Sequence, residues 1–384
     1  MKLNLFLLLA GMLTVFNVFP VSGQHYFVYT GSYTSSAEEG INVYDFDAAK
    51  PSMHFLFTVK GVQDPSFLII HPTGRYLYAV NELMSFEGKS SGAVSAFAID
   101  AASGNLKLLN SRPTGGTAPC HLSVDPTGKW LFTANYGGGN VTVFPLLKDG
   151  RIGPSADIVR HHGHSVNPDR QEAPHVHEVV FDKNSGRLFV PDLGLDKIFI
   201  YNFDPKTGKL SPAKQPWIRT PPGRGPRHLA LSKDGETVYV LGEISSSVMV
   251  YHLQSGIPPA LLQETSMLPD DFKGPNTGAE ITLSPDERFL YASNRGHHSL
   301  VQYTVDPVSG KLKVKAYFPS GGKNPRFFCF DPTGSYVFSA NQTSDNILLY
   351  KYDKESGRLS ATGIEVKPPQ PVCLAFLRKR FTQE

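Results

Sequence analysis

A short segment recurs seven times along the chain, about every fifty residues. In six copies it is a turn built from Asp, Ser, Pro and Gly, followed by an apolar strand that ends in a small or polar residue. These copies lie at residues 71–81, 125–135, 182–192, 232–242, 284–294 and 331–341, and residues 27–31 match the strand alone. A period of this length with several short strands in each unit is typical of β-propeller blades.

A second extended segment, usually opened by Pro, precedes each turn. Its copies lie at residues 65–70, 119–124, 174–179, 226–231, 278–283 and 325–330, with a seventh at 371–376. The seventh copy has no following partner and residues 27–31 have no preceding one, so their pairing would close a ring. The sequence therefore predicts an all-β, seven-bladed β-propeller with four-stranded blades. We expect one domain over residues 24–384, with its N- and C-terminal strands paired.

Composition excludes several other classes of protein. The chain contains 35 Gly and 30 Pro, only 18% of its residues are charged, and its formal net charge is +3. Frequent Gly and Pro argue against a helical bundle, and the low charge argues against disorder. A charge this close to neutral gives no footprint for nucleic-acid binding.

Residues 1–23 have the layout of a secretory signal peptide. Lys2 is followed by an apolar run over residues 3–19 and by a small-residue stop at Val21-Ser-Gly23. The alternative is a membrane anchor, but the run is short for a span and has no positive flank after it. We expect cleavage near Gln24 and export to the periplasm or the exterior, with no membrane association afterwards.

Propeller topology places many polar residues at one mouth of the central channel. The turn between the first two strands of a blade lies on one face, so the start of the first strand and the end of the second lie on the other. These positions carry His121, His175, His177, Arg227, His228, Glu280, Arg326, Glu82, Asn135, Tyr136, Asp192, Glu243, Asn294, Arg295, Asn341 and Gln342. Such a set suits a small anionic substrate. Alternatively, these groups pair with one another around a water-filled channel.

Five histidines within residues 161–177 raise the question of a metal site, because imidazole is a common ligand. No Cys lies nearby and no HExxH spacing occurs, so we predict neither a metal nor any other cofactor, although metal binding by this region stays open. Cys120, Cys329 and Cys373 are expected to be buried free thiols. Turn carboxylates such as Asp204 and Asp306 are expected to shape hairpins.

Several motifs resemble a known family. They are Gly116-Thr-Ala-Pro-Cys-His121, Asn135-Tyr-Gly137, Arg170-Gln171, Pro174-His-Val-His177, Asp192-Leu-Gly-Leu-Asp196, Gly223-Arg-Gly-Pro-Arg-His228, Glu243, Ala279-Glu280, Asn294-Arg-Gly296, Asn324-Pro-Arg326 and Asn341-Gln342. In this order the series resembles the seven-bladed propeller lactonases, which include 6-phosphogluconolactonase and carboxy-cis,cis-muconate cyclase. The resemblance implies that the chain is an enzyme hydrolysing a small anionic sugar lactone.

The resemblance also implies site residues. His177 (or His175), Arg227, Glu243 and Arg295 match the active site proposed in the cyclase branch, with Glu243 as general base and His177 as the second acid/base group. Arg227 and Arg295 would hold a carboxylate, a phosphate or the oxyanion. For substrate binding we add His175, Arg170, His228, Glu280, Arg326, Asn135 and Asp192.

The same residues leave other functions open. They could catalyse a muconate-type cycloisomerisation, or bind a sugar acid without catalysis. A salt bridge to Arg227 is an alternative role for Glu243. The predicted export is at odds with the cytoplasmic pathway that uses 6-phosphogluconolactone, so another lactone or sugar acid could be the substrate. The sequence does not address the oligomeric state.

Overall fold

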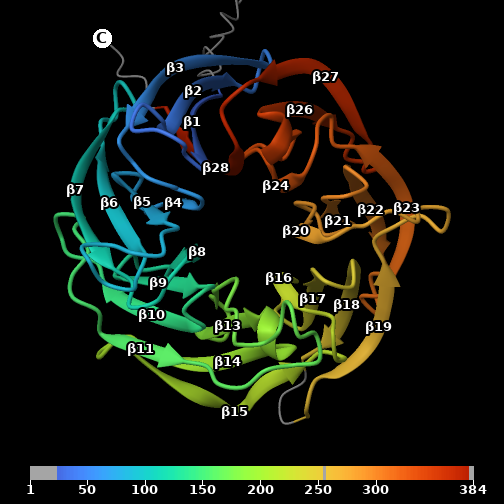
Figure 1. Cartoon of the computed structure of the whole chain (residues 1–384). Coiled ribbons are helices and arrows are strands. Elements are labelled where there is room, and N and C mark those ends of the chain that lie inside the picture. Colours follow the sequence, from blue (N-terminus) through green and yellow to red (C-terminus); the bar gives the residue numbers. More distant parts are fainter. Residues whose placement is uncertain (1–23, 254–256, 380–384) are drawn as a thin grey trace, which may run out of the picture.

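The computed structural model describes residues 24–253 and 257–379, and the predicted signal peptide lies outside these residues. Seven four-stranded antiparallel sheets stand around a central channel, like the blades of a propeller (Figure 1). The predicted seven-bladed architecture is confirmed. In the described part of the chain, no helix is both long and apolar enough to cross a membrane.

Each blade runs from an inner strand beside the channel to an outer strand at the rim. The closing blade contains β28 (Pro371–Arg378), β1 (His25–Ser32), β2 (Gly40–Asp47) and β3 (Ser52–Lys60). The second blade contains β4 (Leu68–Ile70), β5 (Tyr76–Asn81), β6 (Ala93–Ile99) and β7 (Leu106–Pro113). The third contains β8 (Pro119–Val124), β9 (Trp130–Asn135), β10 (Asn140–Pro145) and β11 (Asp157–Arg160). The fourth contains β12 (Val180–Asp182), β13 (Arg187–Asp192), β14 (Lys197–Asp204) and β15 (Lys209–Arg219).

The last three blades follow the same order. The fifth contains β16 (Pro226–Leu231), β17 (Thr237–Gly242), β18 (Ser247–His252) and β19 (Ala260–Ser266). The sixth contains β20 (Gly278–Leu283), β21 (Phe289–Asn294), β22 (Ser299–Val305) and β23 (Leu312–Pro319). The last contains β24 (Pro325–Phe330), β25 (Tyr336–Asn341), β26 (Asn346–Tyr352) and β27 (Leu359–Val366). Two short 3-10 helices, η1 (Leu193–Leu195) and η2 (Gln342–Ser344), follow β13 and β25.

The two ends of the chain meet in one blade. β28 pairs antiparallel with β1, from Tyr26 opposite Arg378 to Ser32 opposite Pro371. The predicted closure of the ring is therefore confirmed. Because β1 also pairs with β2, strands from both ends of the chain share one sheet, and β28 covers the inner edge of β1.

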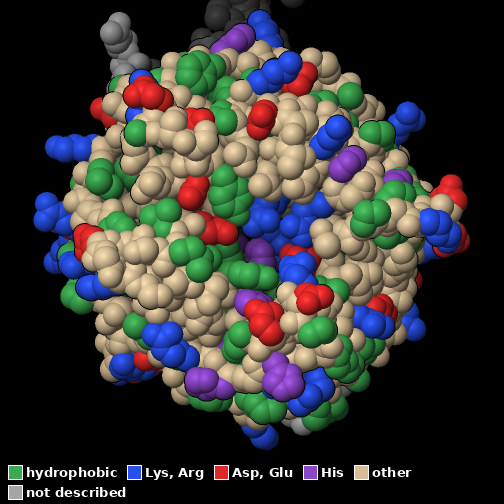
Figure 2. All heavy atoms as spheres, in the orientation of Figure 1, with side chains coloured by type: hydrophobic (Ala, Val, Ile, Leu, Met, Phe, Trp, Pro, Cys, Tyr) green, Lys and Arg blue, Asp and Glu red, His purple; other side chains and the backbone are tan. Residues whose placement is uncertain are grey.

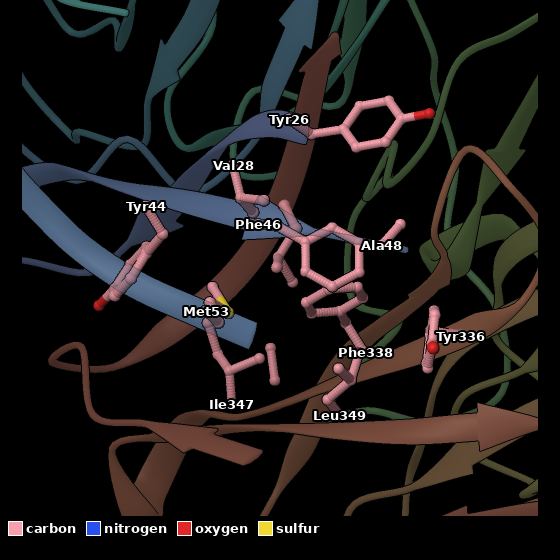
Figure 3. Packing of buried hydrophobic residues seen from close by; sticks show 12 residues of the cluster. Tyr26, Val28, Tyr44, Phe46, Ala48, Met53, Tyr336, Phe338, Ile347 and Leu349 are labelled. Carbon is pink, nitrogen blue, oxygen red and sulfur yellow. The ribbon is translucent and has the colours of Figure 1, made fainter. Parts of the chain in front are cut away.

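Apolar side chains fill the spaces between neighbouring blades. In the cluster of Figure 3, Phe46 of the closing blade packs edge-on against Phe338 of the last blade, with ring centroids 5.0 Å apart. Tyr26, Met53 and Leu349 of this cluster are also buried. Each cluster joins the facing surfaces of two sheets, so a blade obtains its core only by standing beside its neighbours.

Four buried tyrosines connect one blade to the next by the same hydrogen bond. The hydroxyls of Tyr29, Tyr78, Tyr239 and Tyr291 donate to the carbonyls of Gly104, Gly150, Gly310 and Gly357, respectively. We call these four the interblade tyrosines. Each acceptor lies in the turn between the third and fourth strands of the following blade, on the face opposite the channel mouth. The bond satisfies a buried hydroxyl and fixes the spacing of adjacent blades.

Most inner strands carry a β-bulge at the channel. The pairing register shifts between Pro119 and His121 in β8 and between Pro226 and His228 in β16, and β20 and β24 shift at equivalent places. A bulge opposes two residues to one on the partner strand, which redirects a side chain. Consequently, two consecutive residues such as Arg227 and His228 both line the channel.

Two predicted inner strands differ from the structure. β4 covers only Leu68–Ile70, because the chain turns at Asp64, whose φ is 39°, and its carbonyl accepts from the Ser66 amide. The segment predicted at 174–179 precedes β12, and the bridge there pairs Val176 with Asp192. Val176 therefore occupies in its blade the position that Pro226 occupies in the following blade. The Pro-led pattern predicts Pro174 at this position, two residues earlier.

The cysteines and turn carboxylates lie as predicted, with one difference. Cys120, Cys329 and Cys373 are free thiols, but Cys329 is only half-buried. Asp204 and Asp306 accept hydrogen bonds from backbone amides of their own turns, including those of Lys206 and Ser309.

Truncation before Pro371 removes β28 and should abolish cooperative folding. β1 would lose its inner partner and the last blade would lose its neighbour, so both would expose strand edges or core. We expect no cooperative thermal transition by circular dichroism. A chain ending at Lys379, which keeps β28, is the matched control. A native-like transition in the truncated chain would contradict closure as a requirement for folding.

Candidate functional site

The residue that follows the second strand of each blade lies at the mouth end of the channel. These residues are Tyr33, Glu82, Tyr136, Leu193, Glu243, Arg295 and Gln342. In Figure 2 the centre of this face is hollowed, and basic side chains gather there with histidines and carboxylates. The ring of blades therefore brings together groups that are far apart in the sequence.

Glu243 lies at the centre of an arginine cluster. Its Oε1 is 2.5 Å from Nη2 of Arg170, and its Oε2 is 3.1 Å from Nε of Arg227 and 3.0 Å from Nη2 of Arg295. We call these four residues the mouth cluster. Arg227 also donates to the carbonyl of Ala279, and Arg295 donates to that of Gly278.

Arg170 differs from the other two arginines because it comes from a loop. It lies in the long connection between β11 and β12, which the buried amide of Gln171 anchors by donating to the carbonyl of Leu193. The Arg170 side chain is 38% exposed, whereas that of Glu243 is 4% exposed. Arg170 can therefore meet a ligand entering from solvent before the deeper arginines do.

The charge state of Glu243 is set by two opposing effects. Burial raises the pKa of a carboxyl group, but Arg295, Arg227 and Arg170 outweigh it and lower the pKa of Glu243 to about 2. The carboxylate is thus fully ionised near neutral pH and is a weak base as long as the three guanidinium groups surround it.

A second layer of polar groups lies deeper in the channel. Nδ1 of His228 is 3.1 Å from Oε1 of Glu280 and 4.0 Å from Oε1 of Glu178. Nε2 of His121 lies 3.8 Å from the same oxygen of Glu178. We call these four residues the buried His–Glu cluster. Glu178 is further held by the amide of Leu229, which donates to its Oε2 over 2.8 Å.

Burial dominates the proton affinities in this layer. It raises the pKa of Glu280 to about 7 and that of Glu178 well above its usual range. It also lowers the pKa values of His121, His177 and His228 well below 6.5. The imidazoles are therefore neutral near pH 7, and the two carboxyl groups hold protons more readily than exposed ones.

A small cavity connects the two layers. It is lined by Ser66, Phe67, Glu82, Cys120, Arg227, His228, Glu280, Arg326, Phe327 and Val372. Its volume of about 10 Å³ is close to what one water molecule occupies. Since Arg227 also reaches Glu243, this cavity forms the floor of the channel mouth.

Arg326 and Glu82 lie on the far side of this floor. The hydroxyl of Tyr33 donates to Oε2 of Glu82 over 3.0 Å, and the Arg326 guanidinium lies 5.6 Å from the centre of the Tyr33 ring. Burial raises the pKa of Glu82 despite the attraction of Arg326. The floor thus carries both an arginine and a carboxyl group with raised proton affinity.

His177 and His175 have different surroundings. His177 lines the channel beside Cys120, whose thiol donates to its carbonyl, and its ring centre lies 5.1 Å from that of His228. His175 stacks on Tyr136 with ring centres 4.4 Å apart, and its Nε2 lies 3.1 Å from Glu172 Oε1. Both rings therefore lie near the mouth, but His177 is nearer to the buried His–Glu cluster.

Asn135 and Asp192 lie outside the channel lining. As the last residues of β9 and β13, they turn their side chains into their own blades. Asn135 donates to the carbonyl of Asn140, whereas Asp192 accepts from the amides of His175 and Leu195. Because side chains alternate along a strand, Tyr136, which follows Asn135, faces the mouth instead, where its hydroxyl accepts from Arg170.

The histidine-rich stretch does not form a single cluster. Both ring nitrogens of His161 are bonded inside a blade, Nδ1 to Asp192 over 2.6 Å and Nε2 to the Tyr201 hydroxyl over 2.9 Å. His162 and His164 are exposed. Across residues 24–253 and 257–379, no group of three or more His, Cys, Asp or Glu side chains has a geometry that could hold a metal ion.

Sequence reasoning missed Glu178 as a lining residue. Aligning the blades from their turns, rather than from their opening Pro, places Glu178 at the level of His228 and Glu280. The signal was therefore present in the spacing to Asp182, where the turn begins.

Replacing Glu243 by Gln should destabilise the fold in a pH-dependent way. Near pH 7 we expect the free energy of unfolding to fall by about 3–5 kcal/mol, because buried guanidinium groups lose their shared counter-charge. The native pKa of about 2 lies below the ordinary value of 4.5. This stabilisation is therefore complete above about pH 4.5 and lost as the pH falls towards about 2.

Urea denaturation of wild type and variant at about pH 7 and about pH 3 measures this difference. Glu355→Gln is the matched control, because the Glu355 side chain is 91% exposed and its contact with Arg288 is a surface ion pair. A destabilisation by Glu243→Gln that is equal at the two pH values would contradict the electrostatic origin.

Comparison with known proteins agrees with this architecture. A family model described as "Lactonase, 7-bladed beta-propeller" matches residues 27–376. The chain is 33% identical over 356 residues to a 6-phosphogluconolactonase of Bacillus subtilis, covering 92% of this chain and 99% of that protein. A solved structure of a periplasmic gluconolactonase from Pseudomonas aeruginosa is 35% identical, with a TM-score of 0.85, covering 93% of this chain and all of that one. This chain belongs to the family of seven-bladed β-propeller lactonases.

Proposed function

We propose that this chain hydrolyses a small anionic sugar lactone at the channel mouth. The observation that carries the proposal is the convergence of Arg170, Arg227 and Arg295 on one buried carboxylate, in a member of the lactonase family. Guanidinium groups bind carboxylate and phosphate by charge-assisted hydrogen bonds. The relatives described above are named gluconolactonase and 6-phosphogluconolactonase, which supports a sugar lactone as the substrate class.

The arginines would serve two steps of the reaction. Arg170, at the entrance, would bind the anionic group of the substrate. Arg227 and Arg295 are deeper and fixed by backbone carbonyls, so they are suited to stabilise the oxyanion that develops on the lactone carbonyl. His175 and Arg326 flank this space and would contribute to binding.

For proton transfer the sequence favours Glu243 as general base and His177 as the second acid/base group. With a pKa of about 2, Glu243 accepts a proton only after the substrate anion has drawn the arginines away from it. His177 is a neutral imidazole and needs no such rearrangement. Glu243 would thus also serve to position the arginines before the substrate arrives.

Hydrolysis is favoured over cycloisomerisation, the alternative that the residues alone left open. The family model and the relatives described above carry lactonase names. A binding protein without catalysis is likewise less consistent with these relatives. The substrate would be a small molecule, without a nucleic-acid partner.

We also propose that the mature protein is exported. The support is the signal-like pattern of residues 1–23 together with the periplasmic gluconolactonase among the similar structures. An exported enzyme would meet sugar lactones outside the cytoplasm.

Arg170→Gln and Arg227→Gln form a matched pair that tests the function. Acid release from glucono-δ-lactone and 6-phosphoglucono-δ-lactone is measured above spontaneous hydrolysis. For Arg170→Gln we expect a higher KM for the phosphorylated lactone with little change in kcat, because binding at the entrance is lost. For Arg227→Gln we expect kcat to fall by about 10²-fold or more, because oxyanion stabilisation is lost.

Arg288→Gln is the control for both variants, since Arg288 lies among surface turns away from the channel. No acid release by the wild type from any lactone, together with tight binding of a sugar acid, would favour a binding protein. Equal effects of the two variants on kcat would remove the division of roles between the arginines.

The intact mass of the protein from its native host tests export. We expect a chain that begins near Gln24, because a signal peptidase cleaves after small residues such as Ser22 and Gly23. Full-length chain recovered from the cytosolic fraction would contradict the proposal.

A further inference from the structure

The buried His–Glu cluster contains a pair of side chains with the geometry of an acid/base dyad. Nδ1 of His228 lies 3.1 Å from Oε1 and 3.2 Å from Oε2 of Glu280. Nε2 of the same ring is buried and has no hydrogen-bond partner among the described residues. An imidazole oriented through one nitrogen by a carboxylate, with the other nitrogen unengaged, is the arrangement in which histidine serves as a general base.

The pair is held rigidly in place. The bulge in β16 directs both Arg227 and His228 to the channel. Glu280 occupies the equivalent position of β20, where its Oε1 accepts from the Ile281 amide over 3.0 Å. When Glu280 is ionised, its carboxylate accepts the proton of Nδ1 of His228, and Nε2 is left with a lone pair.

The pair also borders the space where a water could lie. His228 and Glu280 both line the cavity of about 10 Å³ beneath the mouth cluster. Phe67 and Phe327 form its apolar walls, and Arg227 joins it to Glu243. A water in this cavity would lie between the pair and the carbonyl of a lactone bound at the mouth.

We propose that His228 is the general base of lactone hydrolysis and that Glu280 is the residue that positions it. This inference rests on the proposed function and assigns to His228 the role that sequence reasoning gave to Glu243. Glu243 then acts by holding the three arginines in place.

The oxygen of the trapped water forms a bond to the lactone carbonyl carbon, the carbonyl π electrons move to its oxygen, and a water proton passes to Nε2 of His228. On collapse the carbonyl re-forms, the bond from carbon to the ring oxygen breaks, and that oxygen takes the proton from Nε2. The product is a hydroxy acid, which ionises and releases one proton to solvent.

Other charged groups around His228 bear on its titration. They are Glu280, Glu178, His121, His177, Arg227, Arg326, Glu243 and Arg295. Burial and the arginines disfavour the imidazolium, whereas the charge of Glu243 favours it. Because the pKa of Glu280 is about 7, its carboxylate gains a proton at a higher pH than His228 does, so the acidic limb of the wild-type profile follows Glu280. Without a titrating carboxyl group at this position, the limb should move to the lower pH at which His228 itself is protonated.

Kinetics of three variants on 6-phosphoglucono-δ-lactone test the assignment. For His228→Asn we expect kcat to fall by about 10²-fold or more with little change in KM. For Glu280→Gln we expect a lower kcat and an acidic limb of the kcat–pH profile displaced to lower pH. Glu280→Asp keeps the charge, so it should leave that limb in place and restore part of kcat.

His71→Asn is the matched control. His71 is also buried, but it lies at a turn on the opposite face, where its Nε2 is 2.9 Å from the Gly128 carbonyl oxygen. We expect its kcat and pH profile to match the wild type. Thermal unfolding of every variant identifies one that fails to fold, and the displaced limb of Glu280→Gln is a readout that a purely structural role would not move.

Three outcomes would overturn the inference. They are a kcat for His228→Asn close to that of the wild type, an unchanged acidic limb in folded Glu280→Gln, and loss of wild-type activity on chelation that a divalent cation restores. The last would mean that the buried His–Glu cluster holds a metal. Absence of hydrolysis by the wild type would overturn the proposed function itself, so the two failures are distinguishable.

Discussion

The pairing of β1 with β28 joins the two ends of the chain in one sheet, and the rest of the molecule depends on it. Each blade buries its apolar faces only against its two neighbours, so an open ring would expose core at both ends. Closure also encloses the channel. Groups from β8, β16, β20 and β24 then face one another across a small space, although they are separated by about fifty residues or more in the sequence.

Charged side chains are buried in this small space, each beside specific partners. Glu243 is stabilised as an anion by three guanidinium groups, whereas Glu280, one layer deeper, has a pKa of about 7. The two carboxyl groups differ because one has arginines in direct contact and the other has imidazoles. One site thus holds a permanent anion that organises cations and a second carboxyl group suited to proton transfer.

The repeat was enough to predict the seven blades, the closure and the mouth, and it placed Arg227, Glu243 and Arg295 on one face. The repeat could not identify which of two consecutive residues at the end of a strand faces the channel. Asp192 was predicted as a binding residue, but strand alternation turns it into its own blade. Glu178 was missed because, in its blade, the opening Pro lies two residues further from the turn than it does in the following blade. The distances within the mouth cluster follow from packing between distant strands, which no local pattern encodes.

The interblade tyrosines all bond on the face opposite the mouth. These four bonds lie away from the face on which the chemistry is assembled, although the hydroxyls of Tyr251, Tyr303 and Tyr350 also donate to carbonyls of the preceding blade. The four bonds do not involve the loop that carries Arg170, so that loop can change without removing any of them. A scaffold of this kind can acquire a new ligand by loop exchange while these contacts between blades persist.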